Sequence, residues 1–152
     1  MGVWVSIGIE ISGGQAAAEV VERVKAQIRA HLSPLPRAGL SVRDLIEPLY
    51  APEADPALRG WPLGRSVNAR TILAEAARTP GVVSVADVLL AQGAGPAVES
   101  VPLEGLELPE LLGISVTVGD PVPLDQLRGA TPVESGSGAI KRLPVPVLAE
   151  TC

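Results

Sequence analysis

The chain has 152 residues, of which 47% are hydrophobic and 2% aromatic, and it carries a formal net charge of −5. The length suffices for one hydrophobic core, and the hydrophobic share excludes a chain that is disordered throughout. The acidic balance argues against nucleic acid or an anionic membrane as a partner.

The first elements along the chain are a strand and a helix. Val3, Val5, Ile7, Ile9 and Ile11 alternate with more polar residues, which predicts a strand with one apolar face. From Gln15 to Leu32 apolar residues recur every three or four positions, which predicts an amphipathic helix capped by Ser12 or a neighbour. Prolines at positions 34 and 36 end it.

A second helix is expected after a loop rich in glycine and proline, "GWPLGR" at 60–65. Ser66 or Asn68 can cap it. Its buried stripe is expected to contain Val67, Ile72, Leu73, Ala76 and Ala77. The sequence Thr79-Pro80-Gly81 ends the helix. Two further strands are expected at 82–90 and 112–118, which we expect to pair antiparallel, and 98–104 can add a short edge strand.

Together these elements predict an α+β fold with about three strands packed by two amphipathic helices, in the order β-α-α-β-β. We expect residues 1–119 to form this domain. Residues 120–152 contain five prolines and show no amphipathic period, so we expect an extended tail rich in proline and glycine. Leu143, Val145 and Val147 alternate with prolines near its end, a pattern that suits docking on a neighbouring subunit.

Few residues suggest chemistry. The single histidine, His31, lies near a helix C-terminus and is expected to be structural. Cys152 is the one cysteine, so no disulfide or thiolate metal site is expected within the chain. The glycines at 93–95 and 136–138 lack the spacing of a phosphate loop. The acids Glu99, Glu104, Glu107 and Glu110 are scattered through a loop. No catalytic residue, metal or cofactor is therefore expected.

Four arginines, Arg59, Arg65, Arg70 and Arg78, surround one acid, Glu75, in the sequence. Two interpretations stand side by side: a solvated helix face, or a charged surface that docks another subunit, since arginine is enriched at interfaces. On the second interpretation, Trp61, Arg65 and Arg70 are candidate interface residues. The scarcity of aromatic residues argues against stacking on nucleic-acid bases.

Several stretches, in order, resemble the C-terminal part of baseplate J-like proteins, which form wedges in contractile phage tails and extracellular contractile injection systems. They are "VWVSIGIEIS", "AHLSPLP", "GWPLGRSV", "ARTPGVVSVADV", "ELPELLGISVTV" and "RLPVPVLAETC". Family members are usually much longer, so this chain is expected to be a fragment, a truncated form or a separately encoded piece. Gly60–Arg65 and Pro80–Val82 carry the resemblance most specifically.

The resemblance implies a structural protein without enzymatic activity. Its expected partners are other wedge subunits, the hub and spike, and the sheath or tube, within a symmetric complex. No signal peptide or apolar run of membrane-spanning length is visible, so cytoplasmic assembly followed by incorporation into the particle is expected. The alternatives are a small ligand-binding regulatory module with an apolar pocket, and a hydrolase built on the scattered acids.

Overall fold

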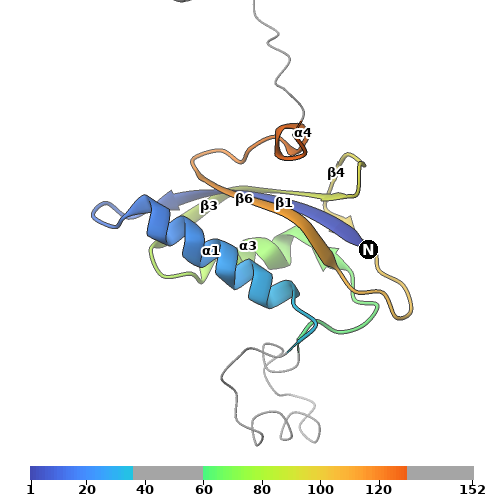
Figure 1. Ribbon diagram of the computed structural model, residues 1–152. Coiled ribbons are helices and arrows are strands. Elements are labelled where there is room, and N and C mark those ends of the chain that lie inside the picture. The colour runs from blue at the N-terminus through green and yellow to red at the C-terminus, as the bar shows by residue number, and fades with distance from the viewer. Residues whose placement is uncertain (36–59, 130–152) are drawn as a thin grey trace, which may run out of the picture.

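The computed structural model describes residues 1–35 and 60–129 (Figure 1). The predicted α+β class is confirmed: this part of the chain contains strands, the longest in one sheet, and three helices. In chain order the elements are β1 (Gly2–Ile11), α1 (Ala17–Leu32), β2 (Val67–Asn68), α3 (Ala69–Ala77), β3 (Val82–Gln92), β4 (Ala97–Val98), β5 (Ser100–Val101), β6 (Glu110–Val118) and α4 (Leu124–Leu127).

The main sheet has four strands rather than about three, in the order β4-β3-β1-β6, and β2 pairs with β5 in a separate ribbon. The expected antiparallel pairing of the second and third long strands is wrong, because both lie against β1. The strand β1 pairs antiparallel with β3 and parallel with β6. The odd-numbered residues Val3 to Ile9 of this central strand are fully buried.

The helices α1 and α3 cover one face of this sheet (Figure 1). The apolar stripe of α1 is buried as its spacing predicts, and it consists of Val20, Val24, Ile28 and Leu32. The stripe of α3 is buried at Ile72 and Ala76, but Leu73, which is 38% exposed, and the exposed Ala77 were wrongly expected to belong to it. The opposite-charge pairs Glu19–Arg23 and Glu22–Lys25 form on the solvent side of α1.

The two predicted helix caps have different outcomes. The Asn68 side chain accepts a hydrogen bond from the Arg70 backbone N–H at 2.8 Å and caps α3, as predicted. Ser12 does not cap α1, because the N-cap position is Ala16, which provides no side-chain hydrogen bond. Val67, which the pattern places in the helical stripe, instead pairs with Val101 in the β2–β5 ribbon.

The second face of the sheet carries α4 (Figure 1). Residues 120–129, which the sequence assigns to the extended tail, include this short helix, and its Leu124 is buried. The Gly119 N–H donates to the Ile9 carbonyl at 2.9 Å, and the Arg128 Nη2 donates to the Gly95 carbonyl at 2.7 Å. A four-residue helix is too short to show a period, which explains why the pattern does not reveal it. Residues 130–152, and with them Leu143, Val145 and Val147, lie outside the described residues.

Candidate functional site

The predicted interface residues Trp61 and Arg65 lie together at the start of the second described segment. The indole Nε1 donates to the Arg65 carbonyl at 3.0 Å, and the Arg65 guanidinium carbon lies 5.6 Å from the centre of the Trp61 ring. Trp61 is only 6% exposed and belongs to the hydrophobic core. Trp61 therefore anchors the loop 60–65 to the core. Of the two residues, only the exposed Arg65 is accessible to another protein.

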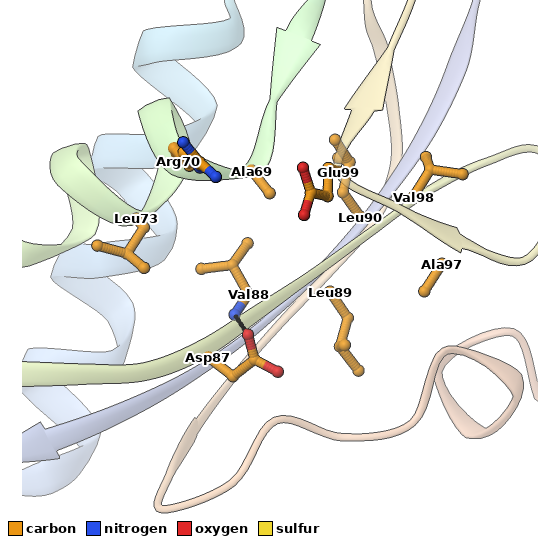
Figure 2. A pocket seen from close by; sticks show the side chains of 10 residues that line it. All are labelled: Ala69, Arg70, Leu73, Asp87, Val88, Leu89, Leu90, Ala97, Val98 and Glu99. Atoms are coloured by element: carbon orange, nitrogen blue, oxygen red, sulfur yellow. Dashed lines mark hydrogen bonds between the residues drawn. The ribbon is translucent and has the colours of Figure 1, made fainter.

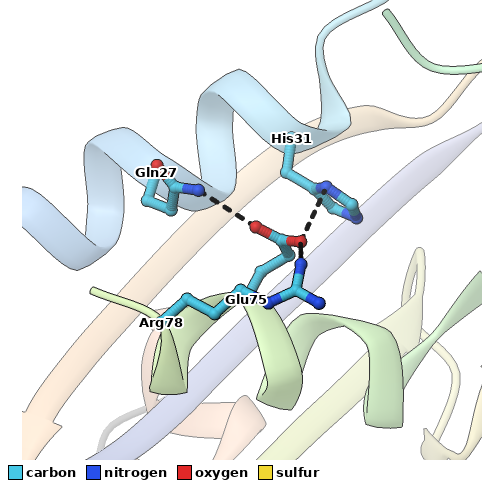
Figure 3. Close-up of polar contacts among 4 residues, drawn as sticks. All are labelled: Gln27, His31, Glu75 and Arg78. Atoms are coloured by element: carbon cyan, nitrogen blue, oxygen red, sulfur yellow. Dashed lines mark hydrogen bonds and ion pairs between the residues drawn. The ribbon is translucent and has the colours of Figure 1, made fainter. Parts of the chain in front are cut away.

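A polar cluster beside Trp61 ties α1 to α3 (Figure 3). The carboxylate of Glu75 on α3 accepts hydrogen bonds from Gln27 Nε2 at 3.0 Å and from Arg78 Nη1 at 2.7 Å. His31 Nδ1 lies 3.9 Å from the same carboxylate. The His31 ring also packs edge-on against Trp61, with 5.2 Å between ring centres. This arrangement agrees with the structural role expected of His31.

Three loops meet at one end of the domain, and we call residues 33–35, 60–65 and 104–107 the three-loop surface. The Trp61 N–H donates to the Ser33 carbonyl at 2.8 Å, and the Gly64 N–H donates to the Glu107 carbonyl at 3.1 Å. A Cβ added at Gly60 would meet the Pro34 carbonyl, and one added at Gly64 would meet the Gly105 carbonyl. These close backbone approaches hold the loops against one another.

Each loop of this surface carries one leucine that is open to solvent. Leu35 is 70% exposed, Leu63 is 56% exposed and Leu106 is 81% exposed. Apolar side chains scattered singly are ordinary on a protein surface. Here, however, they sit on loops that are held together by backbone hydrogen bonds, and the exposed Arg65 lies on the same surface. Apolar residues beside arginine are typical of the contact regions of protein interfaces.

Arg70 lies elsewhere, in a pocket of about 320 Å³ between α3 and the β3–β4 hairpin (Figure 2). The apolar part of the wall includes Leu73, Val88, Leu90 and Val98, and the polar side chains are Arg70, Asp87 and Glu99. Asp87 Oδ1 accepts a hydrogen bond from the Val88 N–H at 2.8 Å. Among the described residues no carboxylate forms an ion pair with Arg70.

The scattered acids do not converge. Glu107 Oε2 accepts a hydrogen bond from the Glu104 N–H at 3.0 Å and so stabilises the loop. Glu99 lines the pocket, and Glu110 begins β6. Residues 1–35 and 60–129 contain no group of three metal-ligand side chains. Gly93 and Gly95 belong to the turn between β3 and β4, as their loop assignment predicts.

The four clustered arginines separate in the structure. Arg78 pairs with Glu75, Arg65 lies over Trp61, Arg70 lines the pocket, and Arg59 lies outside the described residues. The three exposed leucines were not found from the sequence. The available signal was a leucine flanked by proline or glycine in each loop, which is weak because isolated loop leucines are common.

No protein-family profile matches the chain, and no curated protein matches it. Within the described segments, no helix combines the length and the apolar character that crossing a bilayer requires.

Proposed function

We propose that this protein is a structural assembly module, a wedge component in the baseplate of a contractile phage tail or injection particle. In this role it joins wedge, hub or spike, and sheath or tube subunits through protein contacts. It assembles in the cytoplasm and then becomes part of the particle. The sequence resemblance to the C-terminal part of baseplate J-like proteins supplies the kind of assembly.

The observation that carries the proposal is the three-loop surface. Leu35, Leu63 and Leu106 are exposed on loops that are held by backbone hydrogen bonds and by the buried indole of Trp61. A surface that is already ordered loses little conformational entropy when a partner binds. The "GWPLGR" stretch, which contributes to the resemblance, forms the middle of this surface.

The test is co-sedimentation of the full chain with baseplates reconstituted from the wedge, hub and tube proteins of a contractile particle from the same source. The double variant Leu63→Ser/Leu106→Ser is expected to reduce incorporation at least about tenfold. Removing two apolar side chains that the partner would bury costs more than about 1.4 kcal/mol of binding free energy. Val83→Ser is the matched control.

Val83 suits this purpose because its side chain is also apolar and 66% exposed. It lies at the end of the sheet where Ile11 of β1 pairs with Val82. The loop 104–107 of the three-loop surface leads into β6, which begins beside Gly2 at the opposite end of the sheet. Incorporation of the Val83 variant should equal that of the wild type. If the wild-type chain fails to enter any baseplate, the proposed function is wrong.

The pocket favours a second candidate, a small ligand-binding regulatory module. Its wall combines an apolar lining with one cation and two carboxylates, which suits a small molecule with an apolar body, a carboxylate and an amine. A thermal-shift screen of apolar amino acids tests it. A stabilisation lost in Arg70→Ala would support it, and no shift at millimolar concentrations would exclude ligands of this class.

A further inference from the structure

The two long outer strands of the sheet differ in how they are protected against pairing with another strand. An exposed strand edge offers unpaired N–H and C=O groups, and natural proteins block such edges with bulges, charges or prolines. The edge of β3 is blocked in this way. Its pairing with β1 contains two irregularities, β4 covers Leu90 and Ala91, and the Asp87 carboxylate binds the Val88 N–H.

The edge of β6 lacks these devices. After one irregularity at its start, β6 pairs in regular register with β1 from Gly113 to Val118. This stretch, "GISVTV", contains no charged residue and no proline. Among the described residues no strand pairs with its other side. Such an edge is expected to be covered in the functional state.

The register identifies the backbone groups that face outward. The Glu110 N–H donates to the Met1 carbonyl and the Gly119 N–H donates to the Ile9 carbonyl, so the parallel ladder reaches both ends of β6. Because backbone groups alternate along a strand, Gly113, Ser115 and Thr117 face β1. Ile114, Val116 and Val118 face outward. Their side chains share the face of the sheet that packs against α1, and Val118 is still 52% exposed.

We propose that the edge of β6 binds the chain's own segment Leu143–Leu148, "LPVPVL", as an added strand. An added strand binds the edge through alternate residues only. In this segment Leu143, Val145 and Val147 have backbone N–H groups, and prolines occupy positions 144 and 146. When the N–H groups of Leu143, Val145 and Val147 point toward β6, both prolines point away from it, where no N–H is needed. The added strand then offers no N–H at the prolines and blocks further pairing.

Side-chain chemistry and chain length both agree with this occupant. In an antiparallel ladder, residues whose backbone groups face one another lie directly opposite and share a face. In this orientation Leu143, Val145 and Val147 would extend the apolar layer of Ile114, Val116 and Val118. The chain between Gly129 and Leu143 reaches roughly 45–50 Å when extended. The sheet of four strands is about 15 Å wide. The segment can therefore reach β6 of its own molecule or of a second copy.

This inference deepens the proposed function, because it specifies where the predicted docking strip of the tail binds. Its test is amide hydrogen exchange, measured by NMR on the full chain at several concentrations. In the wild type the outward amides of Ile114, Val116 and Val118 are expected to be protected. Val145→Pro removes a required N–H, so their exchange should accelerate at least about tenfold. Pro144→Ala, which changes an outward-facing position, should leave protection intact.

The amides of Ser115 and Thr117 serve as the internal control, since they face β1 and should stay protected in every variant. Fast exchange of the outward amides in the wild type would overturn the proposal. Protection that survives Val145→Pro would also overturn it and would assign the edge to another occupant, such as β6 of a second copy. Because the isolated chain is measured, either result leaves the co-sedimentation test of the proposed function unaffected.

Discussion

The indole Nε1 of Trp61 donates a hydrogen bond to the Arg65 carbonyl at 3.0 Å, and the guanidinium carbon of Arg65 lies 5.6 Å from the centre of the same ring. One buried aromatic side chain thus fixes both the backbone and an exposed cation of the "GWPLGR" stretch. The loop is held by the core rather than by its own turn residues alone. This relationship explains how a glycine- and proline-rich loop can present an ordered surface.

Replacing the indole by a smaller ring is expected to weaken this anchor. Trp61→Phe keeps most of the apolar contact but removes the Nε1 donor, which should lower the free energy of unfolding by about 1–2 kcal/mol. Arg65→Ala removes only an exposed cation–π contact, so its cost should stay below about 1 kcal/mol. Urea denaturation followed by circular dichroism measures both. Equal losses in the two variants would contradict the anchoring role of Trp61.

The Glu75 carboxylate is expected to contribute more to the free energy of unfolding than its exposed partner Arg78. Glu75→Ala leaves Gln27 without its acceptor on α3 and removes the carboxylate that lies 3.9 Å from His31, which should cost about 1–3 kcal/mol. Arg78→Ala removes one exposed partner and should cost less than about 1 kcal/mol. Thermal and urea unfolding of both variants test this order, and a larger loss for the arginine variant would reverse it.

A methyl group at Gly8 is expected to displace the segment on the second face of the sheet. A Cβ there would collide with the Gly119 carbonyl oxygen and lie 2.7 Å from the Pro121 nitrogen. Both neighbours are backbone atoms, so Gly8→Ala should destabilise the protein by about 1–3 kcal/mol. At Gly13 a Cβ meets nothing within 4 Å, and Gly13→Ala provides the control. Proteolysis that releases residues beyond 119 faster in Gly8→Ala alone is the expected readout.

The pair Glu22–Lys25 predicts a local pH dependence. A hydrogen bond from Lys25 Nζ at 2.8 Å, together with its charge, lowers the pKa of Glu22 below its ordinary value of 4.5. A lowered pKa in the folded state means that the pair stabilises the protein above the unfolded pKa and loses this effect as the pH falls through the folded pKa. Lys25→Gln should raise the Glu22 pKa in an NMR titration, while Lys25→Arg should keep it low. An unchanged pKa in Lys25→Gln would exclude Lys25 as the cause.

Local pattern predicted the long elements well. Alternation from Val3 to Ile11 identified β1, the apolar stripe identified α1, and Asn68 was one of two caps proposed for α3. Each of these depends on spacing within one element. The two-residue strand β2 was beyond such reasoning, because two residues show no period, and Val67 is expected in a helix for that reason. The short strand expected at 98–104 is present as β5, but it pairs with β2 and not with the main sheet.

The order of the strands, and the segments that pack on the faces of the sheet, depend on contacts between residues distant in sequence. No local pattern encodes such contacts. The central place of β1 and the helix α4 were both missed. One signal was present: Ser6 and Gly8 on β1 are small residues on the second face, and the backbone of Gly119 and Pro121 approaches Gly8 closely. These small residues leave room for a segment to pack there, as residues 119–129 do. The exposed leucines of the three-loop surface became a candidate site only when hydrogen bonds brought the loops together.

Electron cryo-microscopy of reconstituted baseplates that contain this chain tests the assembly role most directly. We expect one domain of this fold in each repeating unit, with Leu35, Leu63 and Leu106 buried against a neighbouring subunit. Particles that form completely without the chain, or that carry it with these leucines facing solvent, would contradict the account.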